Sequence, residues 1–262
     1  MESQEQVSFE FPQGNDLLKR LQAIEFEMAV AIKDIFERND IRYVIEYGSL
    51  LGAVRHGGFI PWDDDFDFVV FEEDYEKASA ALRKELPGKY ILHDRLSDPR
   101  YLYSFSKVRH LHSVATEEGF TEDLKYQGIS IDLFKGRIEN NNRFARRLFV
   151  ARSHTSSHWH KFTHSHRLGE LVKTVGNGLF VVYYSLLHSM TPKSPYFHKS
   201  PDSDQYFLPL DKYLPLSRVT FNGIEFYAPH DPDYVLSDRY GNWRKYPEKI
   251  SFHVGNVVIY SE

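Results

Sequence analysis

Two aspartates separated by a single residue stand at the start of an apolar run. Asp65 and Asp67 flank Phe66, and the run continues to Phe71. Because alternate side chains of a strand share a face, both carboxylates are expected on one side of it and Phe66 on the core side. Adjacent carboxylates repel unless a cation lies between them, and oxygen ligands suit Mg²⁺ or Mn²⁺. A magnesium-type metal site is therefore the first hypothesis.

Two further features favour this hypothesis. Asp132 lies in the apolar segment Ser130–Phe134 and supplies a third carboxylate if that segment is a neighbouring strand. Three converging carboxylates can hold two ions, of which one activates an attacking oxygen and one stabilises a leaving phosphate. Gly48-Ser49 follows a predicted strand, and such a turn brings backbone amides and a hydroxyl close to a phosphate. The alternative is that Asp63–Asp65 is only a solvated acidic loop.

Apolar periodicity and chain breakers predict the elements that position these residues. A helix is expected between Asn15 and Asn39, a second over Asp74–Leu86 and a third over Asp231–Tyr240. Strands are expected over Ile41–Tyr47, Phe66–Phe71, Tyr90–His93, Tyr103–Val108 and Ile129–Phe134. Asn222-Gly223 predicts a tight hairpin, and residues 143–190 are expected to be mainly helical. This order mixes helices with strands.

Composition narrows the class of protein. The 262 residues carry a net charge of -5, which argues against a dedicated nucleic-acid binder, so no nucleic-acid partner is expected. The chain has no cysteine, which excludes disulfides and thiolate metal sites. The first five residues are polar and acidic, and no apolar run reaches the roughly 20 residues of a membrane span. A cytoplasmic location is expected.

A basic segment rich in histidine lies in the middle of the chain. Its histidines are His154, His158, His160, His164 and His166. Their spacing on a helix can hold Zn²⁺, but no His-Glu-x-x-His arrangement accompanies it. An interfacial helix that meets anionic lipid, or an ordinary solvated face, explains the pattern better. The first of these predicts a peripheral contact with the inner face of the membrane.

The motif residues together resemble a known signature. The run Tyr47-Gly-Ser-Leu-Leu-Gly-Ala-Val-Arg-His-Gly-Gly-Phe-Ile-Pro-Trp-Asp-Asp-Asp-Phe-Asp67 is closely similar to that of the LicD family, which includes bacterial phosphocholine transferases, fukutin and fukutin-related protein. Weaker matches are Lys107-Val-Arg109, Gly128-Ile-Ser-Ile-Asp-Leu-Phe134, and Tyr240-Gly-Asn-Trp243 with Pro247. The resemblance covers roughly residues 15–250.

The resemblance implies a fold and a domain layout. The fold would be α+β and nucleotidyltransferase-like, with a mixed central sheet flanked by helices and a helical lobe. Residues 1–14 would form a flexible N-terminus and residues 15–262 a single catalytic domain. The basic lobe on the acceptor side would span about 140–215. Asp65, Asp67 and Asp132 would be the metal ligands and catalytic residues, and Gly48 with Ser49 would hold donor phosphate.

The resemblance also implies the reaction. A phosphorylated alcohol would pass from a CDP-activated donor to a hydroxyl of a glycan or lipid-linked glycan, with release of CMP. Arg55, Lys107 and Arg109 are candidates for countering phosphate charge, since guanidinium and ammonium groups bind phosphate well. Lys107 and Arg109 are expected on one strand face, and either can instead be an exposed edge charge. His56 either binds phosphate or closes the turn.

Several functions remain open on the sequence alone. Phosphocholine is the favoured group, with teichoic acid, lipopolysaccharide or capsule as the acceptor. Ribitol phosphate or glycerol phosphate could be transferred instead. The same carboxylates also suit true nucleotidyl transfer, in which pyrophosphate leaves. A non-catalytic protein that binds a glycan or nucleotide is the remaining alternative, and the three aspartates argue against it.

Overall fold

The structure is a computed structural model that describes residues 15–101, 103–116, 124–141, 194–199, 207–247 and 256–260. The chain divides into two compact units. The larger comprises Met1–Arg137, Lys199–Asp204 and Asp211–Glu262, and the smaller comprises Ile138–His198 and Gln205–Leu210. The larger unit therefore holds every residue of the predicted metal and donor sites.

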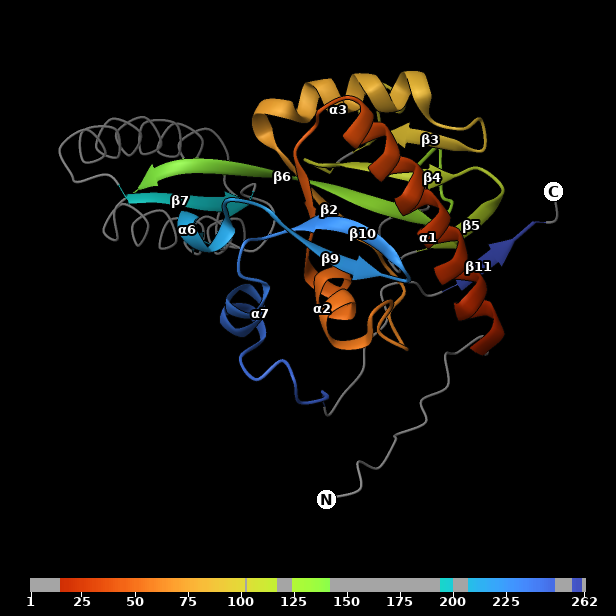
Figure 1. Cartoon of the computed structure of the whole chain (residues 1–262). Helices are drawn as coiled ribbons and strands as arrows, with labels where there is room; N and C mark the ends of the chain where they lie inside the picture. Colours follow the sequence, from red (N-terminus) through yellow and green to blue (C-terminus); the bar gives the residue numbers. More distant parts are fainter. Residues whose placement is uncertain are drawn as a thin grey trace, which may run out of the picture. The chain divides into compact units, whose positions relative to one another are not determined.

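The larger unit is built on a mixed β-sheet with the strand order β1-β2-β6-β4-β3 (Figure 1). Its strands are β1 (Tyr43–Ile45), β2 (Asp67–Phe71), β3 (Tyr90–His93), β4 (Ser106–His110) and β6 (Ser130–Asn141). β2 and β6 pair in parallel, whereas the other three neighbouring pairs are antiparallel. This mixed sheet with flanking helices confirms the predicted α+β fold.

One row of the sheet crosses three strands and carries charged side chains. Asp67 on β2 lies opposite Asp132 on β6, and Asp132 lies opposite Lys107 on β4. Their neighbours along the strands, such as Phe68 and Ile131, are fully buried in the hydrophobic core. Because alternate side chains project from opposite faces of a sheet, the three charged side chains share the face away from this core.

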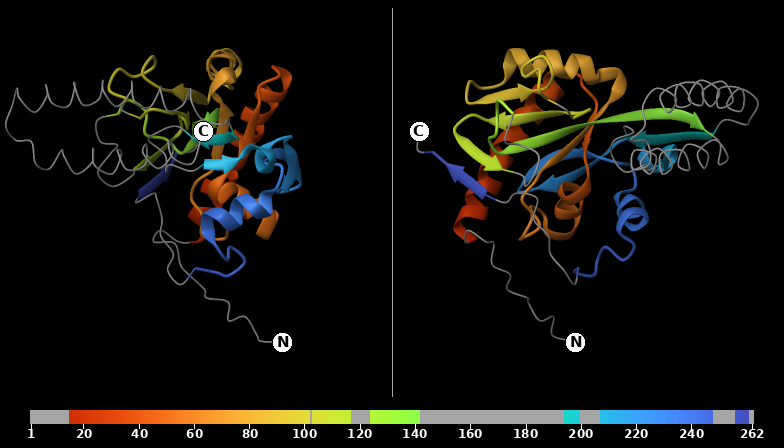
Figure 2. Two further views of the ribbon diagram at one scale, coloured as in Figure 1. Left: turned by 90° about the vertical axis from the view of Figure 1, so that its left-hand side faces the viewer. Right: turned by 180° about the vertical axis from the view of Figure 1, so that it is seen from behind.

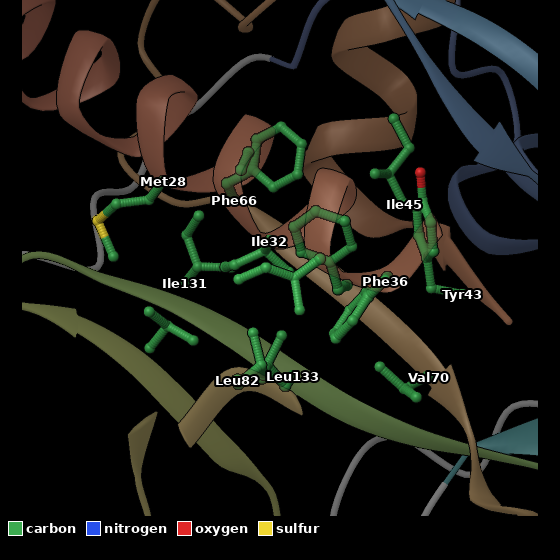
Figure 3. Packing of buried hydrophobic residues seen from close by; sticks show 14 of the residues in the cluster. Met28, Ile32, Phe36, Tyr43, Ile45, Phe66, Val70, Leu82, Ile131 and Leu133 are labelled. Carbon is green, nitrogen blue, oxygen red and sulfur yellow. The ribbon is translucent and has the colours of Figure 1, made fainter. Parts of the chain in front are cut away.

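Two helices cover the core face of the sheet. α1 (Asn15–Arg38) and α3 (Glu72–Glu85) contact each other and the sheet (Figures 1 and 2). Ile32 and Phe36 of α1 lie among Ile131 and Leu133 of β6, as Figure 3 shows. The apolar residues whose helical spacing predicts α1 therefore form its buried face.

A second group of elements surrounds the helix α2 (Tyr47–His56). The group consists of β9 (Ser217–Phe221), β10 (Ile224–Ala228) and α7 (Pro232–Tyr240). β9 and α7 contact α2, and β10 contacts β1 (Figure 2). The hairpin between β9 and β10 turns at Asn222 and Gly223, whose φ angles of 47° and 82° are those of the predicted tight turn.

The segment around Gly48-Ser49 differs from its prediction. β1 is shorter than the expected strand Ile41–Tyr47, and α2 begins directly at Tyr47, whose φ is 55°. Gly48 and Ser49 therefore lie in the first turn of a helix, so their assignment to a turn between a strand and a separate apolar segment is wrong. The left-handed conformation of Tyr47 bends the chain from strand into helix within one residue.

The remaining described elements are short. They are β5 (Ser113–Thr116), β11 (Asn256–Ile259), α6 (Leu210–Tyr213), β7 (Ser194–Lys199) and β8 (Phe207–Pro209). β5 pairs with β11, and in the smaller unit β7 pairs with β8 and with β6. The smaller unit overlaps the predicted acceptor-side lobe. The predicted flexible N-terminus 1–14, the predicted helical segment 143–190 and the histidines at 153–167 lie outside the described residues. Among the described residues, no helix is long and apolar enough to cross a membrane.

Candidate active site

The charged row of the sheet contains a close ion pair. The Nζ atom of Lys107 lies 2.8 Å from Oδ1 of Asp132, and their side chains are only 6% and 19% exposed. The ammonium group also lies over the ring of Tyr103, 5.2 Å from its centroid. Lys107 thus contacts one of the predicted metal ligands, and its positive charge offsets part of the negative charge on this face.

Asp67 places a buried carboxyl group among other negative charges. Its side chain is buried, and burial raises its pKa well above the usual aspartate value. The negative charges of Asp65, Asp132 and Asp63 raise the pKa further, and Lys107 lowers it only in part. The folded protein thus disfavours a negative charge on Asp67, as expected for a carboxylate cluster whose charge a cation would neutralise.

The first turn of α2 lies directly against Asp67. The Oγ atom of the buried Ser49 accepts a hydrogen bond of 2.8 Å from the backbone N–H of Asp67. Ser49 therefore positions the start of β2 and does not itself line the pocket, so its predicted contact with phosphate stays a prediction. Gly48 lines the pocket beside this turn, at the helix end where backbone N–H groups and the helix dipole favour anions.

A pocket of about 710 Å³ opens at this face of the larger unit. Its acidic residues are Asp63, Asp65 and Asp67, its basic residues are Arg55, Arg239 and Lys245, and its aromatic residues are Tyr47, Trp62, Tyr240, Trp243 and Tyr246. Two segments build it, one running from Tyr47 to Asp67 and the other from Arg239 to Pro247. The main sequence signature and its weaker C-terminal match therefore meet in one cavity.

Arg55 joins the two segments of the pocket wall. Its Nη1 donates a 2.8 Å hydrogen bond to the carbonyl oxygen of Trp243, and its guanidinium lies 5.0 Å from the ring centroid of Tyr246. Its Nε donates to Nε2 of His56 at 2.9 Å. Burial and the neighbouring guanidinium lower the pKa of His56, which favours the neutral imidazole that this bond requires. Arg55 lines the pocket, whereas His56 does not line it and contacts Arg55 instead.

Arg109 lies on the same strand as Lys107 but has different partners. Its side chain is buried, Nε donates to Nδ1 of His93 at 3.1 Å, and Nη1 donates to the carbonyl oxygen of Gly128 at 2.8 Å. Arg109 does not line the pocket. Its contacts tie β4 to β3 and to the segment before β6, and its predicted contact with phosphate stays a prediction.

The structure adds pocket residues that the sequence did not single out. Arg239, Lys245 and Tyr246 lie in the wall, and Asp63 faces it from the acidic loop. The sequence signal for the C-terminal segment was the short match Tyr240-Gly-Asn-Trp243 with Pro247. Isolated basic or aromatic residues such as Arg239 and Tyr246 form no periodic pattern that would mark them. Only the folded chain shows that these residues bring positive charge to an acidic wall.

Two of the three predicted metal ligands line the pocket. Among the described residues, no three His, Asp or Glu side chains converge closely enough to form a ready-made metal site. Asp65 and Asp67 both line the pocket, whereas the carboxylate of Asp132 pairs with Lys107. Magnesium commonly uses one or two carboxylates and completes its coordination with water and substrate phosphate. Two aspartates at the wall are compatible with this mode of binding, and the assignment of Asp65, Asp67 and Asp132 as metal ligands stays a prediction.

The fold and site together define a class of protein. A mixed sheet with the charged row Asp67, Asp132 and Lys107, beside the N-terminus of a short helix, fits a nucleotidyltransferase-like domain. The family model described as "LicD/FKTN/FKRP, nucleotidyltransferase domain" matches residues 40–174, which is more than half of the chain. The chain belongs to this family.

Short segments of several known proteins are similar to this chain. The lipopolysaccharide cholinephosphotransferase LicD of Haemophilus influenzae is 49% identical over 41 residues, which are 16% of each protein. The human ribitol 5-phosphate transferase FKRP is 48% identical over 48 residues, 18% of this chain and 10% of FKRP. An uncharacterised protein of Rickettsia prowazekii is 54% identical over 41 residues, 16% of this chain and 15% of that protein. The matched segments thus cover a small part of each relative.

Replacing Gly48 with alanine is expected to weaken donor binding more than folding. A Cβ atom at Gly48 would lie 2.5 Å from Oδ2 of Asp63, so the carboxylate must leave its place in the pocket wall. We expect KM for the donor to rise on the order of tenfold, since small displacements of positioning groups have effects of this size. Steady-state kinetics and thermal melting measure the two quantities.

The matched control for this variant is Gly88→Ala. Nothing lies within 4 Å of a Cβ atom built on Gly88, and its φ angle is not in the left-handed region. Its KM should equal that of the wild type. An unchanged KM in Gly48→Ala as well would show that the position of Asp63 does not affect donor binding.

Proposed function

We propose that the chain transfers a phosphorylated alcohol from a CDP-activated donor to a hydroxyl of a glycan or lipid-linked glycan and releases CMP. Membership of the LicD/FKTN/FKRP family supports phosphoalcohol transfer as the broad activity. The observation that carries the proposal is the pocket, in which acidic and basic groups face the same space. Its volume of about 710 Å³ also lies within the usual range for small-molecule sites, roughly 300–1,000 Å³.

Each wall of the pocket has a role in this proposal. Asp65 and Asp67 would hold Mg²⁺ or Mn²⁺, which would supply positive charge to offset the negative charge of the donor phosphates. Arg55 supplies a cation near the donor, and its bond to the carbonyl oxygen of Trp243 holds it in place. Gly48 and Ser49 bring the N-terminal end of α2 to the phosphate. These groups position the donor and stabilise negative charge, which are the main requirements of phosphoryl transfer.

The transfer step then breaks one phosphorus–oxygen bond and forms another. The acceptor hydroxyl oxygen attacks the phosphorus that carries the alcohol, and CMP leaves with the electrons of the broken bond. Asp132 takes the hydroxyl proton in one version of this step. In the other, activation of the hydroxyl at the site suffices and the proton passes to water. The ion pair with Lys107 fixes the position of the Asp132 carboxylate in both versions.

Phosphocholine is the first candidate for the transferred group. The similarity to the cholinephosphotransferase of Haemophilus influenzae supports it. Ribitol phosphate is the second candidate, because the similarity to FKRP is nearly as high over a slightly longer segment. Teichoic acid, lipopolysaccharide and capsule are the proposed acceptors, and a cytoplasmic site at the inner face of the membrane belongs to the same proposal.

A donor screen tests the function. The protein is incubated with Mg²⁺, crude acceptor glycan and, in turn, CDP-choline, CDP-ribitol, CDP-glycerol and CTP, and released CMP and pyrophosphate are measured. We expect CMP from one CDP-alcohol, with CDP-choline as the first candidate. Pyrophosphate from CTP alone would replace the proposal with true nucleotidyl transfer. A protein that gives neither product, and that no nucleotide with Mg²⁺ stabilises against heat, would be a non-catalytic member of the family.

A further inference from the structure

Tyr47, the first residue of α2, has a strained backbone and lines the pocket. Its φ angle is 55°, which is uncommon for a residue with a side chain and costs free energy. Such a conformation persists only where the surrounding structure holds it, and it is found mostly at functional sites. Glycine would make the backbone turn more easily, so the aromatic side chain at this position requires its own explanation.

The ring of Tyr47 contacts groups from two distant segments. The ring centroid of Phe134 on β6 lies 5.3 Å from that of Tyr47. The guanidinium carbon of Arg239 on α7 lies 4.1 Å from the same centroid. A guanidinium at this distance over an aromatic ring is attracted by the negative charge of the ring face. Tyr47 therefore holds the charged group of Arg239 beside the first turn of α2.

Arg239 reaches the same cavity as two of the predicted metal ligands. It is partly buried and lines the pocket together with Asp65 and Asp67. Burial raises the pKa of the neighbouring Tyr240 to about 12; the positive charge of Arg239 lowers this pKa, and the negative charge of Asp67 raises it. The guanidinium and the aspartates therefore border one space of the size of a ligand.

A phosphate ligand in this pocket needs positive charge from the wall, because Asp63, Asp65 and Asp67 repel it. Arg55 directs Nη1 to the carbonyl oxygen of Trp243 and Nε to His56, so part of its hydrogen-bonding capacity serves the protein. A guanidinium binds phosphate through a planar fork of N–H groups. A ring contact that orients this fork before the ligand arrives lowers the entropic cost of binding.

We propose that Arg239, oriented by the ring of Tyr47, binds the phosphate groups of the donor nucleoside diphosphate. Tyr47 is a positioning residue in this scheme, because it acts through Arg239. The strained start of α2 then has a purpose, since the turn that begins the helix also carries the ring to the arginine. The inference rests on the proposed function, because it assigns Arg239 to the donor site.

Arg244 provides a matched control on the same segment. Its guanidinium carbon also lies 4.1 Å from an aromatic centroid, that of Trp243, but Arg244 does not line the pocket and pairs with Asp233. The variants are Arg239→Gln, Arg239→Lys, Tyr47→Leu and Arg244→Gln. Isothermal titration with CDP and with pyrophosphate, each in the presence of Mg²⁺, measures affinity, and thermal melting measures folding. Pyrophosphate has no base or sugar, so it isolates the contact with phosphate.

The expected losses of affinity follow the contacts that each variant removes. Arg239→Gln should bind both CDP and pyrophosphate about 30-fold more weakly, as expected for the loss of a charge-assisted hydrogen bond. Arg239→Lys keeps the charge without the planar fork, and we expect a loss of roughly fivefold for both ligands. Tyr47→Leu leaves the guanidinium without its ring and should also lose roughly fivefold. Arg244→Gln removes the same charge and should match the wild type.

Three results would overturn the inference. The first is wild-type affinity for both ligands in Arg239→Gln; if that variant also melted lower, or needed more acceptor for transfer, Arg239 would have a structural or an acceptor-binding role instead. The second is weaker binding of CDP with unchanged binding of pyrophosphate, which would assign the contact to the nucleoside. The third is an equal loss in Arg244→Gln, which would reduce the effect to net charge. If Arg239→Gln does not fold, wild-type affinities in both Arg239→Lys and Tyr47→Leu would reject the inference.

Binding without turnover separates this inference from the proposed function. A wild-type protein that binds CDP and pyrophosphate but releases no CMP from any donor would refute the transfer activity alone, and the Arg239 variants would still decide the binding role. Release of CMP together with wild-type affinities in Arg239→Gln would refute the role of Arg239 alone. A wild-type protein that binds neither ligand in the presence of Mg²⁺ would refute both.

Discussion

Asp67→Asn should abolish measurable transfer, with a loss on the order of 10³-fold or more, while the protein remains folded. Asp67 lines the pocket and interacts electrostatically with Asp65, Asp132 and Asp63. Asparagine keeps the shape of the side chain but removes the negative charge that would bind a metal ion. Asp65→Asn, at the other carboxylate of the pocket wall, should have a similar effect.

Asp67→Asn should lower transfer but raise the thermal stability of the metal-free protein. Burial and neighbouring charges raise the pKa of Asp67 in the folded protein above the ordinary value of 3.8 that it has in the unfolded chain. In metal-free protein, the stabilising contribution of this carboxyl group is therefore complete when the pH lies below the unfolded pKa. The contribution is lost as the pH rises through the folded pKa. Asp67→Asn lacks this loss and should therefore melt higher than the wild type at neutral pH without metal. Thermal melting over a range of pH, with and without Mg²⁺, measures the effect.

An exposed aspartate provides the control for both measurements. Asp34 on α1 has a side chain that is 52% exposed, and Asp34→Asn should keep wild-type turnover and melting. Wild-type turnover in both Asp65→Asn and Asp67→Asn would reject the metal assignment. Lost turnover together with a lower melting temperature would instead indicate a structural role for these carboxylates.

Lys107→Met should lower the free energy of unfolding by about 3 kcal/mol, because removing one partner of a buried ion pair leaves the other charge uncompensated. The ammonium lies 2.8 Å from Oδ1 of Asp132, and both side chains are largely shielded from water. It is also the positive charge that partly offsets the negative charges around Asp67. Methionine keeps the length of the side chain and removes the charge.

Chemical denaturation measures the loss in the free energy of unfolding and tests whether the uncompensated charge of Asp132 causes it. The double variant Lys107→Met with Asp132→Asn should be more stable than Lys107→Met alone, since no unpaired charge then remains. Arg38→Met is the control, because the ion pair of Arg38 with Glu85 is 60% exposed on the arginine side and should contribute at most about 1 kcal/mol. A loss below about 1 kcal/mol in Lys107→Met would mean that the pair does not stabilise the fold.

Local signals in the sequence predict much of the fold. The stripe of α1, the strand at Tyr90–His93, the turn at Asn222-Gly223 and the helix before Gly241 all appear where they are expected. Each depends on side-chain periodicity or on a residue with a special backbone preference, so a short window of sequence contains the information. The helix α2 was not expected, because its start depends on a left-handed Tyr47, a conformation that tyrosine rarely adopts and that no pattern marks.

The sequence by itself determined the family, because the signature from Tyr47 to Asp67 is continuous. It also predicted the acidic residues of the candidate site, because the alternation of Asp67 with apolar residues follows from strand geometry. Only the tertiary structure decided which residues share the site. It aligned Asp132 with Asp67, paired Asp132 with Lys107, and brought Arg239 and Lys245 to the pocket. Contacts between distant segments depend on strand order, register and helix packing, and no local stretch of sequence encodes them.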